Sequence, residues 1–164
     1  MNSSRKIDGL DIRIAYMLGE DGRLSNRELA RRLGISEGNV RNRLKRMQES
    51  GMLRVTAQVD IETQPDTLLA VVGVKIDSRR LSECAEAVAA LPSVLTTCVV
   101  TGRHDLMALV LAHSRPTLVE FVTDELSSVP GVIDSETSIV LKSINFWADA
   151  HKVISSENFE EDLH

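Results

Sequence analysis

Arginine and asparagine side chains are concentrated in one short stretch of the chain, residues 37–47. A guanidinium can donate two parallel hydrogen bonds to guanine, an asparagine amide can pair with adenine, and further cations can neutralise phosphates. Within this stretch Val40, Leu44 and Met47 recur at helical spacing, which predicts a helix with one apolar face. The polar positions, which we expect to face outward, are Glu37, Asn39, Arg41, Asn42, Arg43, Lys45 and Arg46. Such a face would fit the major groove of double-stranded DNA.

Two shorter helices are predicted in front of this one. The first begins at Asp8 and ends at Asp21-Gly22, because its apolar residues keep helical spacing over that range. The second begins at Ser25, since Ser25 and Glu28 have the spacing of a capping box, and it ends at Gly34. Three short helices with tight turns are therefore expected.

The junction between the second and third helices has the composition of a helix-turn-helix motif. Ala30 is small where two helices must approach, Gly34 can take the positive φ of the turn, and Ser36 can cap the third helix. We therefore predict a helix-turn-helix DNA-binding domain over residues 1–55. The side chains predicted to contact DNA are Ser25, Ser36, Asn39, Arg41, Asn42, Arg43, Lys45 and Arg46. The alternative is a plain three-helix bundle whose charged face is only solvated.

The distribution of charge indicates a division of the chain near residue 55. The protein has 164 residues and a net charge of −5, which taken whole argues against a nucleic-acid partner. Residues 1–55, however, carry twelve basic and seven acidic side chains, a net +5, whereas residues 56–164 carry seven basic and seventeen acidic ones, a net −10. Such asymmetry indicates two modules with different partners.

The composition also argues against several classes of protein. With 43% apolar and 26% charged residues, the chain should fold as a soluble globular protein. We expect no secretory signal, no membrane span and a cytoplasmic location. Cys84 and Cys98 lack the spacing of a CxxC or Cys/His ligand set, so we expect no metal and no cofactor. Scattered histidines and the lack of a phosphate-binding or nucleophile motif argue against an enzyme.

The acidic part of the chain alternates strand and helix patterns. After a linker strand over residues 56–67, strands are predicted at 68–76, 94–101, 105–112 and 132–141, with helices at 81–91 and 116–129. The expected fold class is α+β, in which a winged helix-turn-helix precedes a ferredoxin-like βαββαβ domain over residues 68–142. Because both helices would cover one face of its antiparallel sheet, a second protomer is expected on the other face. Residues 143–164 are predicted to be a C-terminal extension with an acidic tail, either mobile or helical against a neighbour.

Several short motifs are distributed over about residues 7–142. They are Leu10-Asp11, Arg23-Leu24-Ser25, Glu28-Leu29-Ala30, Gly34-Ile35-Ser36, Val40 with Arg43, Gly51, the Gly102 to Asp105 turn, and Val129-Pro130-Gly131-Val132. In this order the motifs resemble those of the Lrp/AsnC family of transcription regulators. The resemblance implies a bacterial or archaeal DNA-binding protein that dimerises through the ferredoxin-like domain and often assembles four dimers into an octamer.

The resemblance also implies a response to an amino acid or related small molecule. The effector pocket of the family lies near the turn between the second and third strands of that domain and the start of its fourth strand. The residues at those places are Thr101, Gly102, Arg103, His104, Asp105, Glu136, Thr137 and Ser138. Backbone N–H groups at Gly102 could approach a carboxylate and Asp105 could receive an ammonium, or both residues could simply satisfy the geometry of a hairpin turn.

These observations predict a sequence-specific transcriptional regulator that responds to a small metabolite. Its homodimer would place two recognition helices in successive major grooves. The alternative is a metabolite-sensing interaction module that does not bind DNA, in which the three helices serve as an adaptor to a protein partner.

Overall fold

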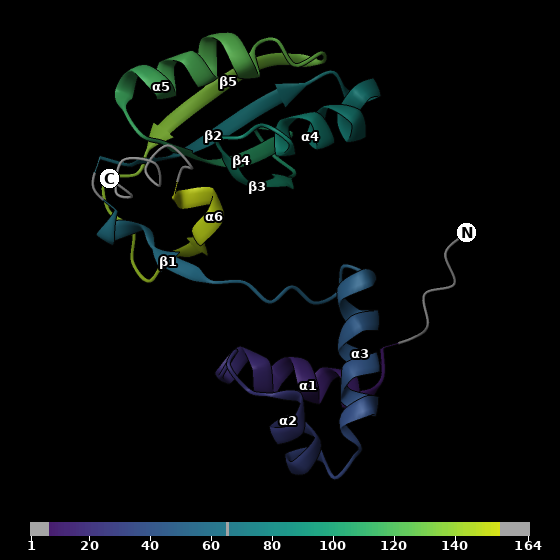
Figure 1. Cartoon of the computed structure of the whole chain (residues 1–164). Helices are drawn as coiled ribbons and strands as arrows, with labels where there is room; N and C mark the ends of the chain where they lie inside the picture. Colours follow the sequence, from purple (N-terminus) through teal and green to yellow (C-terminus); the bar gives the residue numbers. More distant parts are fainter. Residues whose placement is uncertain (1–6, 65, 155–164) are drawn as a thin grey trace, which may run out of the picture. The chain divides into compact units, whose positions relative to one another are not determined.

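The computed structural model describes residues 7–64 and 66–154. The chain divides into two compact units, with the boundary between Thr56 and Ala57 (Figure 1). Each unit buries apolar side chains of its own, as an independently folding domain must.

The first unit consists of three helices, α1 (Gly9–Glu20), α2 (Asn26–Leu33) and α3 (Glu37–Glu49), as predicted. Its core is formed by Ile14, Leu29, Ala30, Val40 and Met47. The turn between α2 and α3 depends on Gly34, which has a φ of 69° and donates its N–H to the carbonyl of Ala30. A side chain at this φ would be strained, so glycine fixes the angle at which α3 leaves α2. After α3 the chain reaches Thr56 without forming a strand.

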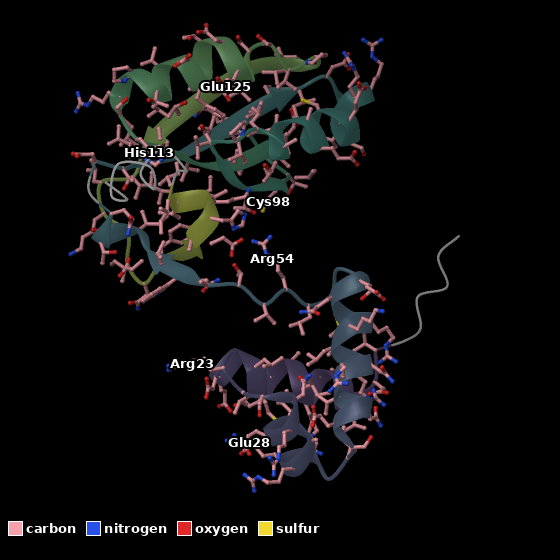
Figure 2. The ribbon with its side chains drawn as sticks, in the orientation of Figure 1. Arg23, Glu28, Arg54, Cys98, His113 and Glu125 are labelled. Carbon is pink, nitrogen blue, oxygen red and sulfur yellow. The ribbon has the colours of Figure 1, made fainter. Side chains whose placement is uncertain are left out.

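The predicted capping box at the start of α2 is only half formed. Ser25 accepts a hydrogen bond from the Glu28 N–H at 3.1 Å, but the Glu28 carboxylate does not return to the cap. It instead receives hydrogen bonds from Arg31 and Arg32 on the next turn, and these lower the pKa of Glu28 to about 2. Glu28 is labelled on the first unit in Figure 2. A complete capping box lies at α1, where Asp8 is the cap.

The second unit contains the predicted four-stranded sheet. Its strands β2 (Leu68–Ile76), β3 (Val94–Val99), β4 (Leu106–Ala112) and β5 (Val132–Ile139) are antiparallel and lie in the order β3-β4-β2-β5. Helix α4 (Leu81–Ala89) connects β2 to β3, and α5 (Arg115–Glu120) connects β4 to β5. This is the ferredoxin-like topology. The second helix differs from the prediction, since a π-helical segment from Phe121 to Leu126 continues α5.

One face of the sheet packs against the helices. Alternate residues of β2, namely Ala70, Val72, Val74 and Ile76, point to this face and are at most 5% exposed. The intervening residues of β2 point to the opposite face.

The chain's own C-terminal segment packs on part of that opposite face. Strand β6 (Trp147–Asp149) pairs with β1 (Gln58–Asp60), and helix α6 (Ala150–Val153) follows it (Figure 1). Ala148 and Val153 pack with Leu69 and Leu111 of the sheet. The chain itself therefore covers part of this face, and a second protomer on the rest of it stays a prediction. The acidic end of the extension, residues 155–164, lies outside the described residues.

Candidate functional site

The outer face of α3 presents several polar side chains predicted to contact DNA. Asn39, Arg41, Asn42 and Lys45 are exposed. Arg41 pairs with Glu37 at 2.9 Å, and Lys45 pairs with Glu49 at 3.7 Å, both four residues apart on the helix. Exposed pairs of this kind contribute little free energy, so both cations remain available to phosphates or bases.

The predicted serines lie at the N-termini of the two helices. Ser25 caps α2, and Ser36 caps α3 by accepting the Asn39 N–H at 3.2 Å. Helix N-termini offer backbone N–H groups and a positive dipole end, which suit them to contact phosphates.

Arg43 does not face outward as predicted, and Arg46 does so only in part. Nη1 of Arg43 lies 2.8 Å from Oδ1 of Asp11 and 2.6 Å from Oδ2 of Asp8, and its side chain is only 17% exposed. Nη2 of Arg46 lies 2.5 Å from the other oxygen of Asp11. Because Asp11 is 1% exposed, it draws both guanidiniums toward α1. The interaction holds α3 against α1 and leaves fewer cations on the outer face.

The network changes the acidity of its carboxyl groups. Burial by itself would raise the pKa of Asp11, but hydrogen bonds from Arg43 and the Asp8 N–H, with the charges of Arg46 and Arg43, lower it below its usual value. The hydrogen bond from Arg43 is the main reason that the pKa of Asp8 is also lowered. Both carboxylates are therefore stabilised in their charged form by folding.

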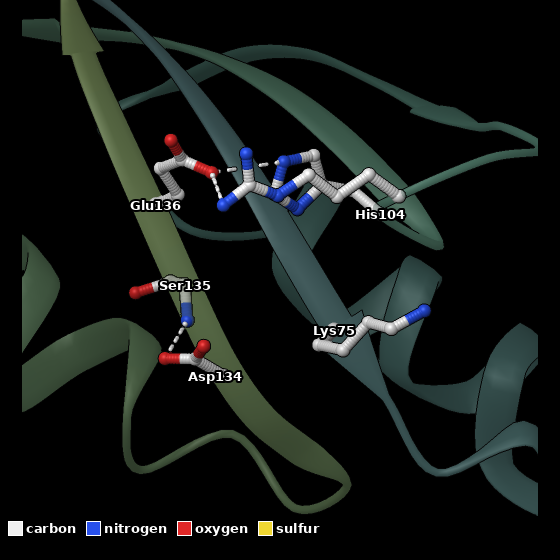
Figure 3. Close-up of a pocket in the computed structure, with 6 residues that line it drawn as sticks. Lys75, His104, Asp134, Ser135 and Glu136 are labelled. Atoms are coloured by element: carbon white, nitrogen blue, oxygen red, sulfur yellow. Dashed lines mark hydrogen bonds and ion pairs between the residues drawn. The ribbon is translucent and has the colours of Figure 1, made fainter.

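The second unit contains a polar pocket of about 440 Å³ at one end of the sheet (Figure 3). Its lining comes from β2, the segment between β3 and β4, and β5. The residues that line it are Lys75, Arg103, His104, Asp134, Ser135 and Glu136.

Glu136 is the point where charges from two segments meet. Its Oε2 lies 3.2 Å from Nη2 of Arg103 and 3.3 Å from Nε2 of His104, as the dashed lines in Figure 3 indicate. The His104 ring lies over Gly73 of β2, because a Cβ at that position would be 2.6 Å from two ring atoms. Gly73 thus provides the space that brings His104 to Glu136.

Asp105 has a structural environment. Its Oδ2 accepts the Ile76 N–H at 2.9 Å, and its Oδ1 lies 3.3 Å from Nζ of Lys75. The backbone hydrogen bond from Ile76 is the largest reason that the pKa of Asp105 is lowered. Asp105 therefore ties the β3–β4 turn to the end of β2 instead of making a bond within the turn, and its carboxylate contacts the pocket-lining residue Lys75.

The remaining predicted effector residues are distributed around the pocket. Thr101 and Gly102 are exposed in the β3–β4 turn, where Gly102 has a φ of 123°. Thr137 pairs with Val72, whose side chain is on the helix-covered face, so the expectation that Thr137 faces the pocket is wrong. Ser138 shares the face of Glu136 but does not line the pocket.

Three lining residues were not predicted. Asp134 and Ser135 precede Glu136 on β5, and Lys75 is the only charged residue of β2. A lysine in an otherwise apolar strand was the signal that could have identified the third side of the pocket.

Two kinds of feature are absent from the described part of the chain. No group of three or more His, Cys, Asp or Glu side chains there could hold a metal ion. None of its helices is long and apolar enough to cross a membrane.

Comparison with known proteins matches both units. Residues 7–54 match the family model of winged helix-turn-helix DNA-binding domains, and residues 69–146 match that of the Lrp/AsnC ligand-binding domain. An uncharacterized HTH-type transcriptional regulator of Pyrococcus furiosus is 38% identical over 145 residues, which cover 88% of this chain and 97% of the relative.

Solved structures show the same arrangement of elements. A transcriptional regulator of Neisseria meningitidis in complex with L-Met is 32% identical, with a TM-score of 0.66 over 86% of this chain and 94% of that one. AsnC of E. coli, at 21% identity, has a TM-score of 0.67 over 86% of this chain and 96% of its own. The leucine response regulatory protein of Mycobacterium tuberculosis, at 22% identity, has a TM-score of 0.76 over 85% of this chain and 96% of its own.

Proposed function

The chain belongs to the Lrp/AsnC family of DNA-binding transcriptional regulators, and from this premise we propose that it binds specific operators through the outer face of α3 under the control of an amino acid. The observation that carries the proposal is the exposed set Asn39, Arg41, Asn42 and Lys45 on the helix that follows the α2–α3 turn. Ser25 and Ser36 add contacts to phosphates at the helix N-termini. Arg43 and Arg46 act mainly by positioning α3.

The proposed effector is an amino acid or a closely related zwitterion, bound at the polar pocket. The lining joins the cations Lys75 and Arg103 to the anions Asp134 and Glu136, so a carboxylate and an ammonium would each have a partner. The L-Met complex of the Neisseria relative supports this class of ligand. A zwitterion would replace the Arg103–Glu136 pair with two new pairs.

The proposed assembly is a homodimer, and four dimers are proposed to form an octamer. Several large apolar side chains of the C-terminal region are exposed and would be buried by a second copy. These are Ile139 at 45%, Leu141 at 98%, Ile144 at 80% and Trp147 at 54%. Two copies of α3 would then enter successive major grooves roughly 34 Å apart. With DNA as its partner, the proposed location is the cytoplasm.

The DNA-binding proposal is tested by fluorescence anisotropy with DNA from upstream of the protein's own gene. If ~6–10 phosphates are neutralised, affinity should fall about 10³- to 10⁵-fold between 50 and 200 mM salt. Arg41→Ala should weaken binding, whereas Arg79→Ala removes a still more exposed cation from the acidic unit and should have no effect. Salt-insensitive binding, or equal loss in both variants, would refute the proposal.

The effector proposal is tested by adding amino acids to the same complex and by light scattering of the protein alone. At least one amino acid should change the DNA affinity or the oligomeric state. Glu136→Gln should abolish that change while Glu86→Gln, on the exposed face of α4, preserves it. A response that survives Glu136→Gln would place the effector elsewhere.

A further inference from the structure

Asn39 lies in the first turn of α3, on the face proposed to enter the major groove. Its Oδ1 accepts a hydrogen bond from Nε of Arg43 at 2.9 Å. The residue is otherwise exposed. Because this hydrogen bond turns the amide oxygen toward Arg43, the NH₂ group is the part of the amide that faces away from Arg43.

Arg43 is itself fixed. Its Nη1 is bound by Asp8 at 2.6 Å and by Asp11 at 2.8 Å, and the side chain is 17% exposed. Asp11 is buried and also accepts hydrogen bonds from Arg46 and the Asp8 N–H. The chain of contacts from Asp11 through Arg43 therefore holds the Asn39 amide in one orientation.

We propose that Asn39 is a specificity-determining residue that presents its NH₂ group to the base and selects guanine rather than adenine. Guanine presents two acceptors, N7 and O6, in the major groove. Adenine presents a donor beside its N7 acceptor, and bidentate pairing with adenine would require the Asn39 oxygen to turn from Arg43 to the base. Arg43 and Asp11 are then positioning residues, which act through Asn39.

Asn42 provides an internal comparison. It is exposed on the same helix, and no hydrogen bond of its side chain is found within the described residues. Its amide can turn either way, so Asn42 keeps the usual ability of asparagine to pair with adenine.

The inference rests on the proposed use of α3 as the recognition helix. It is tested with the full-length protein by measuring the affinity for every single base-pair change of an operator. The base pair contacted by Asn39 is the one whose preference disappears in Asn39→Ala. Wild type should prefer guanine there by about three- to tenfold, the size expected for a neutral hydrogen bond.

Two further variants test whether the preference depends on the NH₂ donor of Asn39 facing the base. Asn39→Asp replaces the donor with an acceptor and should shift the preference to cytosine, whose N4 group donates. Arg43→Lys releases Oδ1 of Asn39. The affinity for adenine at this base pair, and at no other, should then approach the affinity for guanine. Asn42→Asp is the matched control, and it should leave the preference at the Asn39 base pair unchanged.

Some outcomes would overturn the inference while leaving the proposed function intact. One such outcome is that binding is specific and salt-dependent, but Asn39→Ala changes the base preference at no position of the operator. A wild-type preference for adenine at the Asn39 base pair would do so as well. If Arg41→Ala also leaves specific binding unchanged, the proposed recognition face itself is wrong.

Discussion

Replacing Asp11 with asparagine should destabilise the DNA-binding unit strongly. Asp11 is 1% exposed and accepts hydrogen bonds from Arg43, Arg46 and the Asp8 N–H. Asparagine has nearly the same shape but no charge, so two guanidiniums would lose their shared buried partner. Removing one member of a buried ion pair typically costs about 3–5 kcal/mol.

The structure places the expected loss at the lower end of that range. Arg43 keeps its contact with Asp8 at 2.6 Å, and the Arg46 side chain, 38% exposed, can turn toward water. We therefore expect about 3 kcal/mol. A unit of this size has a free energy of unfolding of only about 3–8 kcal/mol, and the loss corresponds to a fall in Tm of about 10–25 °C.

The assay is thermal and urea unfolding of the full chain, followed by far-UV circular dichroism for the helices. Trp147, the only tryptophan, reports separately on the second unit. Glu37→Gln is the matched control, because it removes a carboxylate from the exposed pair with Arg41 and should cost less than about 1 kcal/mol. A free energy of unfolding for Asp11→Asn within about 0.5 kcal/mol of wild type would refute the reasoning.

Three other outcomes are expected. Folding lowers the pKa values of Asp8 and Asp11, so the stability that these carboxylates contribute is present above about pH 4 and is lost as the pH falls below it. Acid titration of the helical circular dichroism signal should therefore be steeper in wild type than in Asp11→Asn. Gly73→Ala places a Cβ against the His104 ring, so it should lower the free energy of unfolding by about 1–3 kcal/mol and weaken the effector response measured by titration. Gly38→Ala, where a Cβ meets no atom within 4 Å, should do neither. Lys152→Met removes a hydrogen bond of 2.7 Å to the Val94 carbonyl and should lower the free energy of unfolding of the second unit by about 1 kcal/mol. Urea unfolding followed by Trp147 fluorescence measures this loss, and Lys142→Met should not reproduce it.

The elements of the fold could be predicted because their signals are local. The β2 strand has the predicted bounds, because its apolar residues lie between polar segments that mark where the strand begins and ends. The α2–α3 turn follows from Gly34, whose positive φ is a property of a single residue.

The orientation of side chains could not be predicted in the same way. Arg43 and Arg46 occupy polar positions of α3, and the pattern of that helix alone places them outside. Their actual direction depends on Asp11, which lies 32 and 35 residues away in the sequence. A buried aspartate on α1 is visible only when the helices are packed together.

The pocket shows the same limit. Arg103, His104 and Glu136 were predicted as candidates, but Lys75 joins them only through the β2–β5 register, which pairs it with Asp134. Thr137 was misplaced because the alternation of a strand decides which face each residue occupies, and the register had to be known first.

The pairing of β1 with β6 also sets the length of the tether between the two units. Because β1 is held by β6, and Met52 and Leu53 donate hydrogen bonds back to the Met47 carbonyl of α3, the connection between the two units has three residues, Arg54 to Thr56, with a maximum reach of about 11 Å. If β6 were removed, the connection could extend to β2 and its reach would increase several-fold. In the proposed dimer, a shorter tether raises the effective concentration of the second helix-turn-helix near its half-site once the first is bound. A three-residue strand near the C-terminus would thereby tune the avidity of DNA binding and the half-site spacings that the protein tolerates.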